Sequence, residues 1–102
     1  MMHWNSPEYE AERRKWQDPE AILEEIGLHA GMTFIDVGCG SGFFALPAAR
    51  MVGKTGKVYG IDISSSAIDT LRERAAQEGL TNVNLIVGKA EETVICQKCA
   101  DT

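Results

Sequence analysis

Residues 34–42 read FIDVGCGSG, an apolar run that passes directly into a glycine-rich loop. The apolar run, residues 33–37, lacks the alternating polar side chains of a half-exposed strand, so it predicts a strand covered on both faces. A helix is predicted over about residues 43–52, although Pro47 inside it lacks a backbone donor and predicts a kink. Strand, loop and helix in this order form the unit at which open α/β sheets bind their ligands.

The same alternation continues towards the C-terminus. Residues 57–62 predict a second strand, the serines at 64–66 predict the start of a helix that runs to about residue 78, and Gly79 predicts its end. A third strand is expected within residues 82–88. Strands that alternate with helices predict a parallel sheet with right-handed crossovers. We therefore expect an α/β fold that forms the front half of a doubly wound parallel sheet, with strand order 3-2-1.

A short helix is predicted before the first strand. Asp18, Pro19 and Glu20 suit the N-cap, the first helical position and the positive end of the helix dipole. The helix should run to about Ile26, and its apolar residues are expected to be buried. These residues are Ile22, Leu23 and Ile26.

Residues 1–17 form an N-terminal extension that is rich in charged and aromatic side chains. Tyr9, Arg13 and Trp16 fall at helical spacing, so Tyr9 and Trp16 can share one face of a helix. Two interpretations are open. The extension is either a helical lid with Tyr9 and Trp16 as its apolar contacts, or a solvated tail.

The spacing of the glycines separates the classes of ligand. Glycine lets the backbone approach a ligand closely, and the N–H groups at a helix start favour an anionic group. A dinucleotide fingerprint needs glycine at its first, third and sixth positions. Gly38 and Gly40 fit, but the sixth position is Phe43 and the third glycine is Gly42. No Gly-Lys-Ser/Thr follows, so the loop is not a nucleotide-triphosphate loop either. A tight structural turn is the plain alternative.

Residues 34–42 resemble the first motif of class I S-adenosylmethionine-dependent methyltransferases. The resemblance implies that the loop wraps the methionine part of the cofactor, and that Asp36 helps to hold its amino group. It also implies the loop residues that contact the cofactor. These are Gly38, Cys39, Gly40 and Gly42.

Asp62 ends the predicted second strand, and Ile63 follows it. A carboxylate at this place can accept hydrogen bonds from both hydroxyls of a ribose, each strengthened by its charge. The resemblance implies this role for Asp62 and packing on adenine for Ile63. The alternative is that Asp62 merely caps the following helix, a task that Ser64 can also perform.

A third motif falls after the third strand, at residues 88–92. The resemblance implies an acceptor for the adenine amino group at position 89, but Lys89 cannot accept that hydrogen bond. We expect the backbone of Ala90 to meet adenine and Glu91 to be the acceptor. An exposed polar loop is the alternative.

The resemblance covers residues 18–102. In detail, this part of the sequence is similar to small-molecule methyltransferases of the quinone-biosynthesis-like group. It implies S-adenosylmethionine as cofactor and a small-molecule methyl acceptor. Residues 18–102 are expected to be the cofactor-binding half of a domain that is incomplete at its C-terminus. No residue is therefore assigned a catalytic role, and the 102-residue chain alone is expected to be inactive. The open edge of the first strand predicts self-association.

Composition restricts the class of protein. Hydrophobic residues make up 44% and charged residues 25%, which is typical of one globular domain. The net charge of −5 argues against a nucleic-acid backbone as partner. No apolar run approaches the roughly 20 residues of a membrane span, and the first residues lack a stretch of signal-peptide type. We expect a cytoplasmic protein that has neither a membrane nor a nucleic acid as its partner.

The three cysteines predict neither a disulfide framework nor a metal site. Cys96 and Cys99 form a single C-x-x-C pair, whereas a structural zinc site needs four ligands. His3 and His29 show no ligand spacing. Two ordinary loop cysteines are favoured over a redox pair, and Cys39 is expected to fill the loop as a small residue.

Three functions from different classes therefore remain open. The favoured one is an S-adenosylmethionine-dependent methyltransferase. The second is a cofactor-binding module without catalysis, and the third is a fragment of a dinucleotide-binding oxidoreductase, which Phe43 disfavours.

Overall fold

The computed structural model of the chain describes residues 7–89. Three parallel strands, β1 (Thr33–Val37), β2 (Lys57–Asp62) and β3 (Val83–Val87), form one sheet in the order β1-β2-β3. This confirms the α/β class and the predicted strand order. The register places Val37 opposite Ile61, so the carboxyl ends of β1 and β2 lie side by side.

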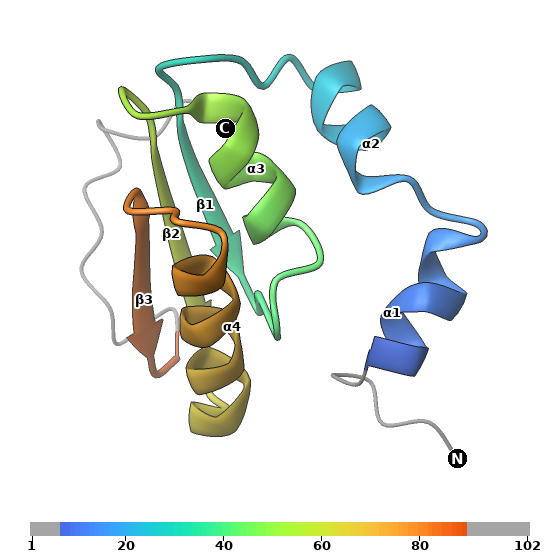
Figure 1. The fold of residues 1–102 in the computed structure, drawn as a ribbon, viewed down its shortest axis with the longest axis vertical. Helices are drawn as coiled ribbons and strands as arrows, with labels where there is room; N and C mark the ends of the chain where they lie inside the picture. Colours follow the sequence, from blue (N-terminus) through green and yellow to red (C-terminus); the bar gives the residue numbers. More distant parts are fainter. Residues whose placement is uncertain (1–6, 90–102) are drawn as a thin grey trace.

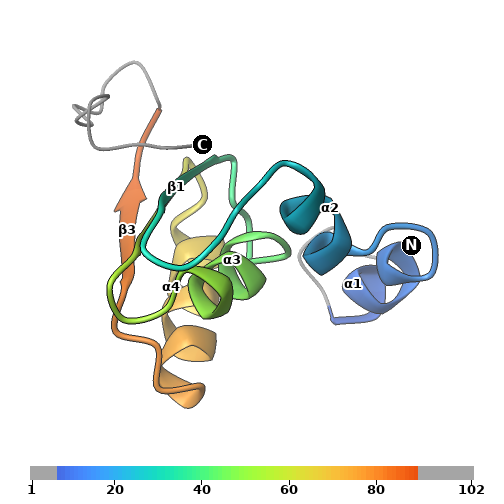
Figure 2. The same ribbon diagram turned by 90° about the horizontal axis from the view of Figure 1, so that it is seen from above.

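Two helices, α3 (Ala45–Val52) and α4 (Ser65–Gln77), cover the same face of the sheet (Figures 1 and 2). Their apolar faces and Val58 of β2 form the core together with Leu23 and Leu28. The hydroxyl of Ser64 caps α4 by accepting a hydrogen bond from the Ala67 amide at 3.2 Å, as the serine run predicts. Within residues 7–89, no helix is long and apolar enough to cross a membrane.

Helix α3 begins later than the sequence predicts. Phe44 is its N-cap, so Pro47 lies in the first turn. Backbone N–H groups in a first turn have no partner inside the helix, and the missing donor of Pro47 therefore costs no helical hydrogen bond. The expectation of a lost bond inside the helix was wrong because the helix start was placed too early. Pro47 is instead part of the buried core.

Strand β1 is less covered than its apolar sequence predicts. Its first four residues are only half-buried, and Val37 is 60% exposed. The reason is that α3 and α4 lie on one face, while no described helix covers the other. Among the described residues β1 pairs with β2 alone. Association through its second edge stays a prediction.

The N-terminal part contains α1 (Pro7–Arg14) and α2 (Pro19–Glu25), which lie beside the sheet rather than over it (Figure 1). The Asp18 carboxylate caps α2 by accepting a hydrogen bond from the Ala21 amide at 3.1 Å. Leu23 is buried as expected, but Ile26 is 56% exposed. Its predicted burial was wrong because α2 ends at Glu25 and Ile26 is already the C-cap, turned away from the core.

Candidate functional site

The loop between β1 and α3 folds back onto the end of β2. The amides of Gly38 and Cys39 both donate to the carbonyl of Ile61, at 2.7 and 3.1 Å. The amide of Gly40 donates to Oδ2 of Asp62 at 2.9 Å. Three successive loop N–H groups therefore already have protein acceptors.

Asp62 bonds to both the glycine loop and the segment before α4. Its side chain is buried, and its Oδ1 accepts a second hydrogen bond from the Ser64 amide at 2.8 Å. The carboxylate thus ties the glycine loop to the segment that starts α4, while Ser64 itself provides the helix cap. An ionised carboxylate has about four acceptor positions, so two protein donors leave capacity for hydroxyl groups of a ligand.

Two glycines of the loop are needed for different reasons. A Cβ at Gly42 would lie 2.5 Å from Cδ1 of Leu71 and 2.9 Å from Cγ of Leu46, so Gly42 lets the loop pack against the core. Gly38 has a φ of +74°, and a Cβ there would meet nothing within 4 Å. Gly38 therefore faces open space, as a ligand-binding position requires.

Cys39 is a buried packing residue. It is 5% exposed, and its Sγ would lie 3.0 Å from a Cβ at Gly60. Burial, with smaller contributions from the charges of Asp36 and Asp62, raises the pKa of the Cys39 thiol to about 12. The side chain fills the loop as a small neutral group, as the sequence predicts, and any ligand contact falls to its backbone.

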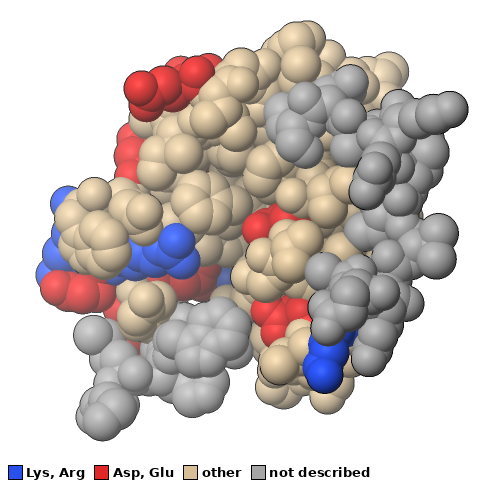
Figure 3. Space-filling model, turned by 180° about the vertical axis from the view of Figure 1, so that it is seen from behind, with Lys and Arg blue, Asp and Glu red and all other residues tan. Residues whose placement is uncertain are grey.

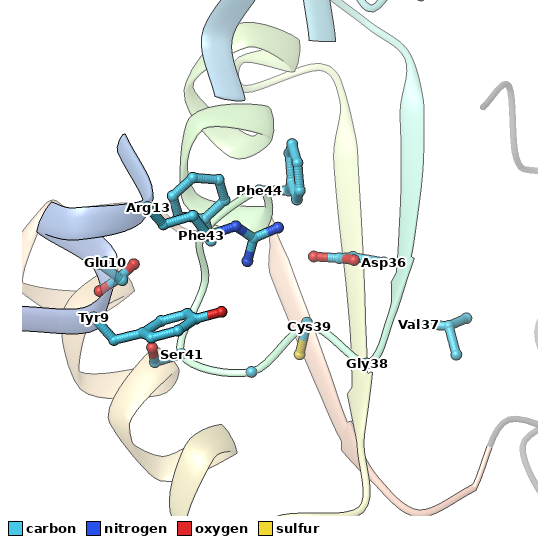
Figure 4. Close-up of a pocket in the computed structure, with 11 residues that line it drawn as sticks. Tyr9, Glu10, Arg13, Asp36, Val37, Gly38, Cys39, Ser41, Phe43 and Phe44 are labelled. Carbon is cyan, nitrogen blue, oxygen red and sulfur yellow. The ribbon is translucent and has the colours of Figure 1, made fainter. Parts of the chain in front are cut away.

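A first cavity lies between the glycine loop and α1. Asp36, at the end of β1, lines it together with Tyr9, Glu10 and Arg13 of α1 (Figure 4). Burial raises the pKa of Asp36 to about 6; the charge of Arg13 lowers it and that of Asp62 raises it. At neutral pH this cavity therefore presents an ionised carboxylate that lacks most of its hydration.

Helix α1 is held against the glycine loop by polar contacts. Arg74 of α4 donates to Oε2 of Glu10 at 2.6 Å and to the carbonyl of Ser41 at 2.9 Å. The Arg13 guanidinium lies over the Phe43 ring, 3.9 Å from its centre. These contacts place α1 beside the glycine loop, and the lid interpretation stays a prediction. Trp16 is 68% exposed and does not line the cavity.

Tyr9, which the sequence offers as an apolar contact of a lid, lines this cavity, and so do Glu10 and Arg13, to which the sequence assigned no role. The signal was present, because Arg13 lies four residues after Tyr9 and so on the same helical face. An arginine in a polar helix is usually solvated, and this made the residue look unremarkable.

A second cavity lies on the other side of Gly38. It is lined by the ends of β1 and β2, by Ile63, and by Gly88 and Lys89, which follow β3. Ile63 is 71% exposed beside the buried Asp62 carboxylate. Val37 and Gly38 line both cavities, which therefore meet along the backbone of Gly38.

Other residues named from the sequence lie outside the described part of the chain. They are Ala90, Glu91, Cys96 and Cys99. Within residues 7–89, no group of three or more His, Cys, Asp or Glu side chains could hold a metal ion.

The electrostatics of this site suit a ligand with positive charge. Figure 3 shows the molecule from behind, with acidic atoms beside a central hollow and basic atoms to its left and at its lower right. The amides of Gly38, Cys39 and Gly40 have protein acceptors, so they are not available to a phosphate group. The expectation of an anionic group concerned the N–H groups at the helix start, and it stays a prediction because α3 begins only at Ala45.

Comparison with known proteins gives a consistent result. A family model described as a methyltransferase domain matches residues 28–102. An aklanonic acid methyltransferase of Streptomyces sp. (strain C5) is 44% identical over 61 residues, which cover 60% of this chain and 28% of that protein. A 2-phytyl-1,4-naphtoquinone methyltransferase of Trichormus variabilis is 42% identical over 64 residues, covering 63% and 27%. The chain thus spans less than a third of the length of these relatives.

Solved structures agree with the observed fold. A SAM-dependent methyltransferase from Aquifex aeolicus superposes with a TM-score of 0.69 at 41% identity, over 89% of this chain and 45% of that one. TrmN from Thermus thermophilus superposes with a TM-score of 0.67 at 32% identity, over 71% and 22%. The described sheet and helices match part of a larger fold in each case.

Proposed function

The chain belongs to the family of S-adenosylmethionine-dependent methyltransferases, and we propose that it holds this cofactor along the glycine loop, across Gly38. The observation that carries the proposal is the meeting of the two cavities at Val37 and Gly38. One cavity contains the Asp36 carboxylate and the other contains that of Asp62. The two ends of an extended ligand can thus each reach a carboxylate.

The cofactor's amino-acid end is assigned to the first cavity, where the ionised Asp36 attracts its ammonium group. Its ribose hydroxyls are assigned to Asp62, which has acceptor capacity beyond its two protein donors. Ile63 is the exposed apolar side chain next to Asp62, and it packs on adenine in this arrangement. The backbone of Ala90 and the carboxylate of Glu91 are proposed to complete the adenine site. Gly40 and Gly42 shape the loop, and Cys39 contributes its backbone.

The same site is poorly suited to a dinucleotide. A dinucleotide fingerprint places a pyrophosphate on free N–H groups at the helix start. Here the amides of Gly38, Cys39 and Gly40 are bonded to Ile61 and Asp62. A pyrophosphate would also approach two carboxylates. We therefore do not favour the oxidoreductase alternative.

The bound cofactor supplies a methyl group on a sulfonium, which an acceptor removes as the sulfur takes back the bonding electrons. The described residues bind and orient this donor. Their contribution to rate is positional, because a fixed donor converts an encounter into an in-line reaction within the site. No described residue is assigned to the acceptor.

We propose a small molecule of quinone-like chemistry as the acceptor. The supporting observation is that relatives at 42% and 35% identity are named as 2-phytyl-1,4-naphtoquinone and demethylmenaquinone methyltransferases. The net negative charge of the chain, −5, agrees with an acceptor that is not a nucleic acid. We propose the cytoplasm as the location of the protein.

Ligand-dependent thermal stability tests the proposal. S-adenosylhomocysteine, the product form of the cofactor, should raise the melting temperature of the purified protein, whereas NAD⁺ should not. A ligand at 100 times its dissociation constant stabilises a protein by about 2.7 kcal/mol, which is several degrees for a small domain. Stabilisation by NAD⁺ alone would contradict the proposal.

Transfer of a labelled methyl group to a reduced naphthoquinone, measured with the full-length gene product that contains these residues, tests the enzyme part separately. We expect label in the quinone product. Tight binding of S-adenosylhomocysteine without transfer to any quinol would instead support the non-catalytic module.

A further inference from the structure

Arg13 and Asp36 face one another across the first cavity. Figure 4 shows the Arg13 guanidinium and the Asp36 carboxylate pointing towards each other, from α1 and from the end of β1. Their charges interact, but within the described residues neither forms an ion pair with the other inside 4.0 Å. The space between them therefore has a cation on one side and an anion on the other.

The position of Arg13 is fixed by its neighbours. Its Nε donates to Oε1 of Gln17 at 2.6 Å, and its guanidinium is stacked on the Phe43 ring at 3.9 Å. One turn earlier on α1, Glu10 is bonded to Arg74, which also bonds the carbonyl of Ser41 in the glycine loop. The guanidinium is thus oriented by both α1 and the loop.

Glu10 does not compete for Arg13. Its side chain is 13% exposed, and its carboxylate is paired with Arg74 at 2.6 Å. Asp36 is therefore the acidic group of the cavity that is left to act on a ligand, and Arg13 is its basic counterpart. The N–H groups of an arginine that lies over an aromatic ring point outward in the plane of the guanidinium, where they can bind a carboxylate.

The amino-acid end of the cofactor carries an ammonium and a carboxylate on the same carbon atom. These two groups match the two charges of the cavity. From this arrangement we infer that Arg13 binds the cofactor's carboxylate while Asp36 takes its ammonium, so that ligand binding holds α1 closed over the site. The inference rests on the proposed function, which assigns this end of the cofactor to the first cavity.

A purely structural role is the competing explanation. Arg13 would then only fasten α1 to Phe43, and its removal would weaken every ligand of the site equally. In the first explanation the loss of Arg13 weakens only the binding of the ligand's carboxylate, and in the second it weakens the binding of the whole ligand. Two ligands that differ only in this carboxylate therefore distinguish the explanations.

The test measures two affinities by calorimetric titration of the purified protein. One ligand is S-adenosylhomocysteine, and the other is S-adenosyl-3-thiopropylamine, which lacks only the carboxylate. The unchanged protein should prefer the first by about ten- to a hundredfold, the effect of one or two charge-assisted hydrogen bonds. Arg13→Met should abolish this preference, and Arg13→Lys should restore part of it.

Arg14→Met is the matched control, because Arg14 lies on the same helix and makes an exposed ion pair with Glu20. It should keep the full preference. An equal loss for both ligands in Arg13→Met, or an unchanged preference, would overturn the inference. If Arg13→Met unfolds, Arg13→Lys with its reduced but measurable preference decides the question. Failure of the unchanged protein to bind either ligand would contradict the proposed function itself.

Discussion

Gly40 and Asp62 lie 22 residues apart and are joined by a 2.9 Å hydrogen bond from the Gly40 amide to Oδ2 of the Asp62 carboxylate. This bond connects the glycine loop after β1 with the end of β2. The two sequence motifs that indicated a cofactor are therefore parts of one structural unit. Asp62 shapes the loop as well as offering acceptor positions to a ligand.

Asp62→Ala should therefore reduce both stability and affinity. The Gly40 amide, which is buried, would lose its acceptor, at a cost of about 1–3 kcal/mol in the free energy of unfolding. Loss of two charge-assisted hydrogen bonds to ribose should weaken S-adenosylhomocysteine by at least ~100-fold. Urea unfolding and calorimetric titration measure the two effects. Asp69→Ala, at an exposed site on α4, is the control. An affinity loss of less than threefold would refute the ribose role.

The raised pKa of Asp36 predicts how stability depends on pH. Because this pKa rises from 3.8 to about 6 on folding, the folded chain holds the proton more tightly than the unfolded chain. Ionisation of Asp36 therefore lowers stability progressively as pH rises from about 4 to above 6, and the full cost is present at neutral pH.

Asp36→Asn should thus be more stable than the unchanged protein at pH 7.5, by an amount of the order of 2 kcal/mol. The difference should shrink as the pH falls towards 4. Urea midpoints at several pH values measure this. A difference that is independent of pH would show that Asp36 ionises normally. The same substitution should weaken S-adenosylhomocysteine, since it removes the charge that attracts the ammonium.

Cys39 should not react with thiol reagents in the native protein. Its pKa of about 12 leaves almost no thiolate at pH 7.5, and its side chain is 5% exposed. Peptide mapping after brief iodoacetamide treatment should find Cys39 unmodified without denaturant and modified in urea. Rapid native labelling at Cys39 would mean that the glycine loop opens readily.

Gly42→Ala should destabilise the fold by more than the cost of a strained backbone alone. The new Cβ would lie 2.5 Å from Cδ1 of Leu71, in addition to the strain of a φ of +106°. Overpacking of a core typically costs about 1–3 kcal/mol. The urea midpoint should therefore fall further than for Gly27→Ala, whose φ is +91° and whose Cβ would meet nothing. Equal losses would contradict the packing role.

The strands were predictable because a buried strand needs a continuous apolar run and its end needs a turn. The bounds of β1 and β2 agree with the sequence interpretation. Helix ends were less predictable: α3 begins two residues after the expected Phe43, and Ile26 falls at the cap of α2 instead of inside it.

The polar partners of the site could not be read from the sequence. Glu10 and Arg74 are 64 residues apart, and only the fold brings them to 2.6 Å. Trp16, which the spacing predicts on the face of Tyr9, lies beyond the end of α1 at Arg14 and is exposed. A helical pattern gives the face of a helix but not the neighbour against which that face lies.

The most direct test of the account compares two glycines with nearly the same positive φ. Gly38 and Gly79 have φ values of +74° and +70°, and a Cβ at either would meet nothing within 4 Å. Alanine at each should cost about the same stability, about 1 kcal/mol, because the strain is equal. Only Gly38 lies where the two cavities meet, so only its methyl group would block the ligand. Calorimetric titration with S-adenosylhomocysteine should show an affinity loss of about thirtyfold or more for Gly38→Ala, since removing the close backbone approach forfeits about 2 kcal/mol or more. Gly79→Ala should bind like the unchanged protein, and equal affinities for the two variants would contradict the claim that the cofactor crosses Gly38.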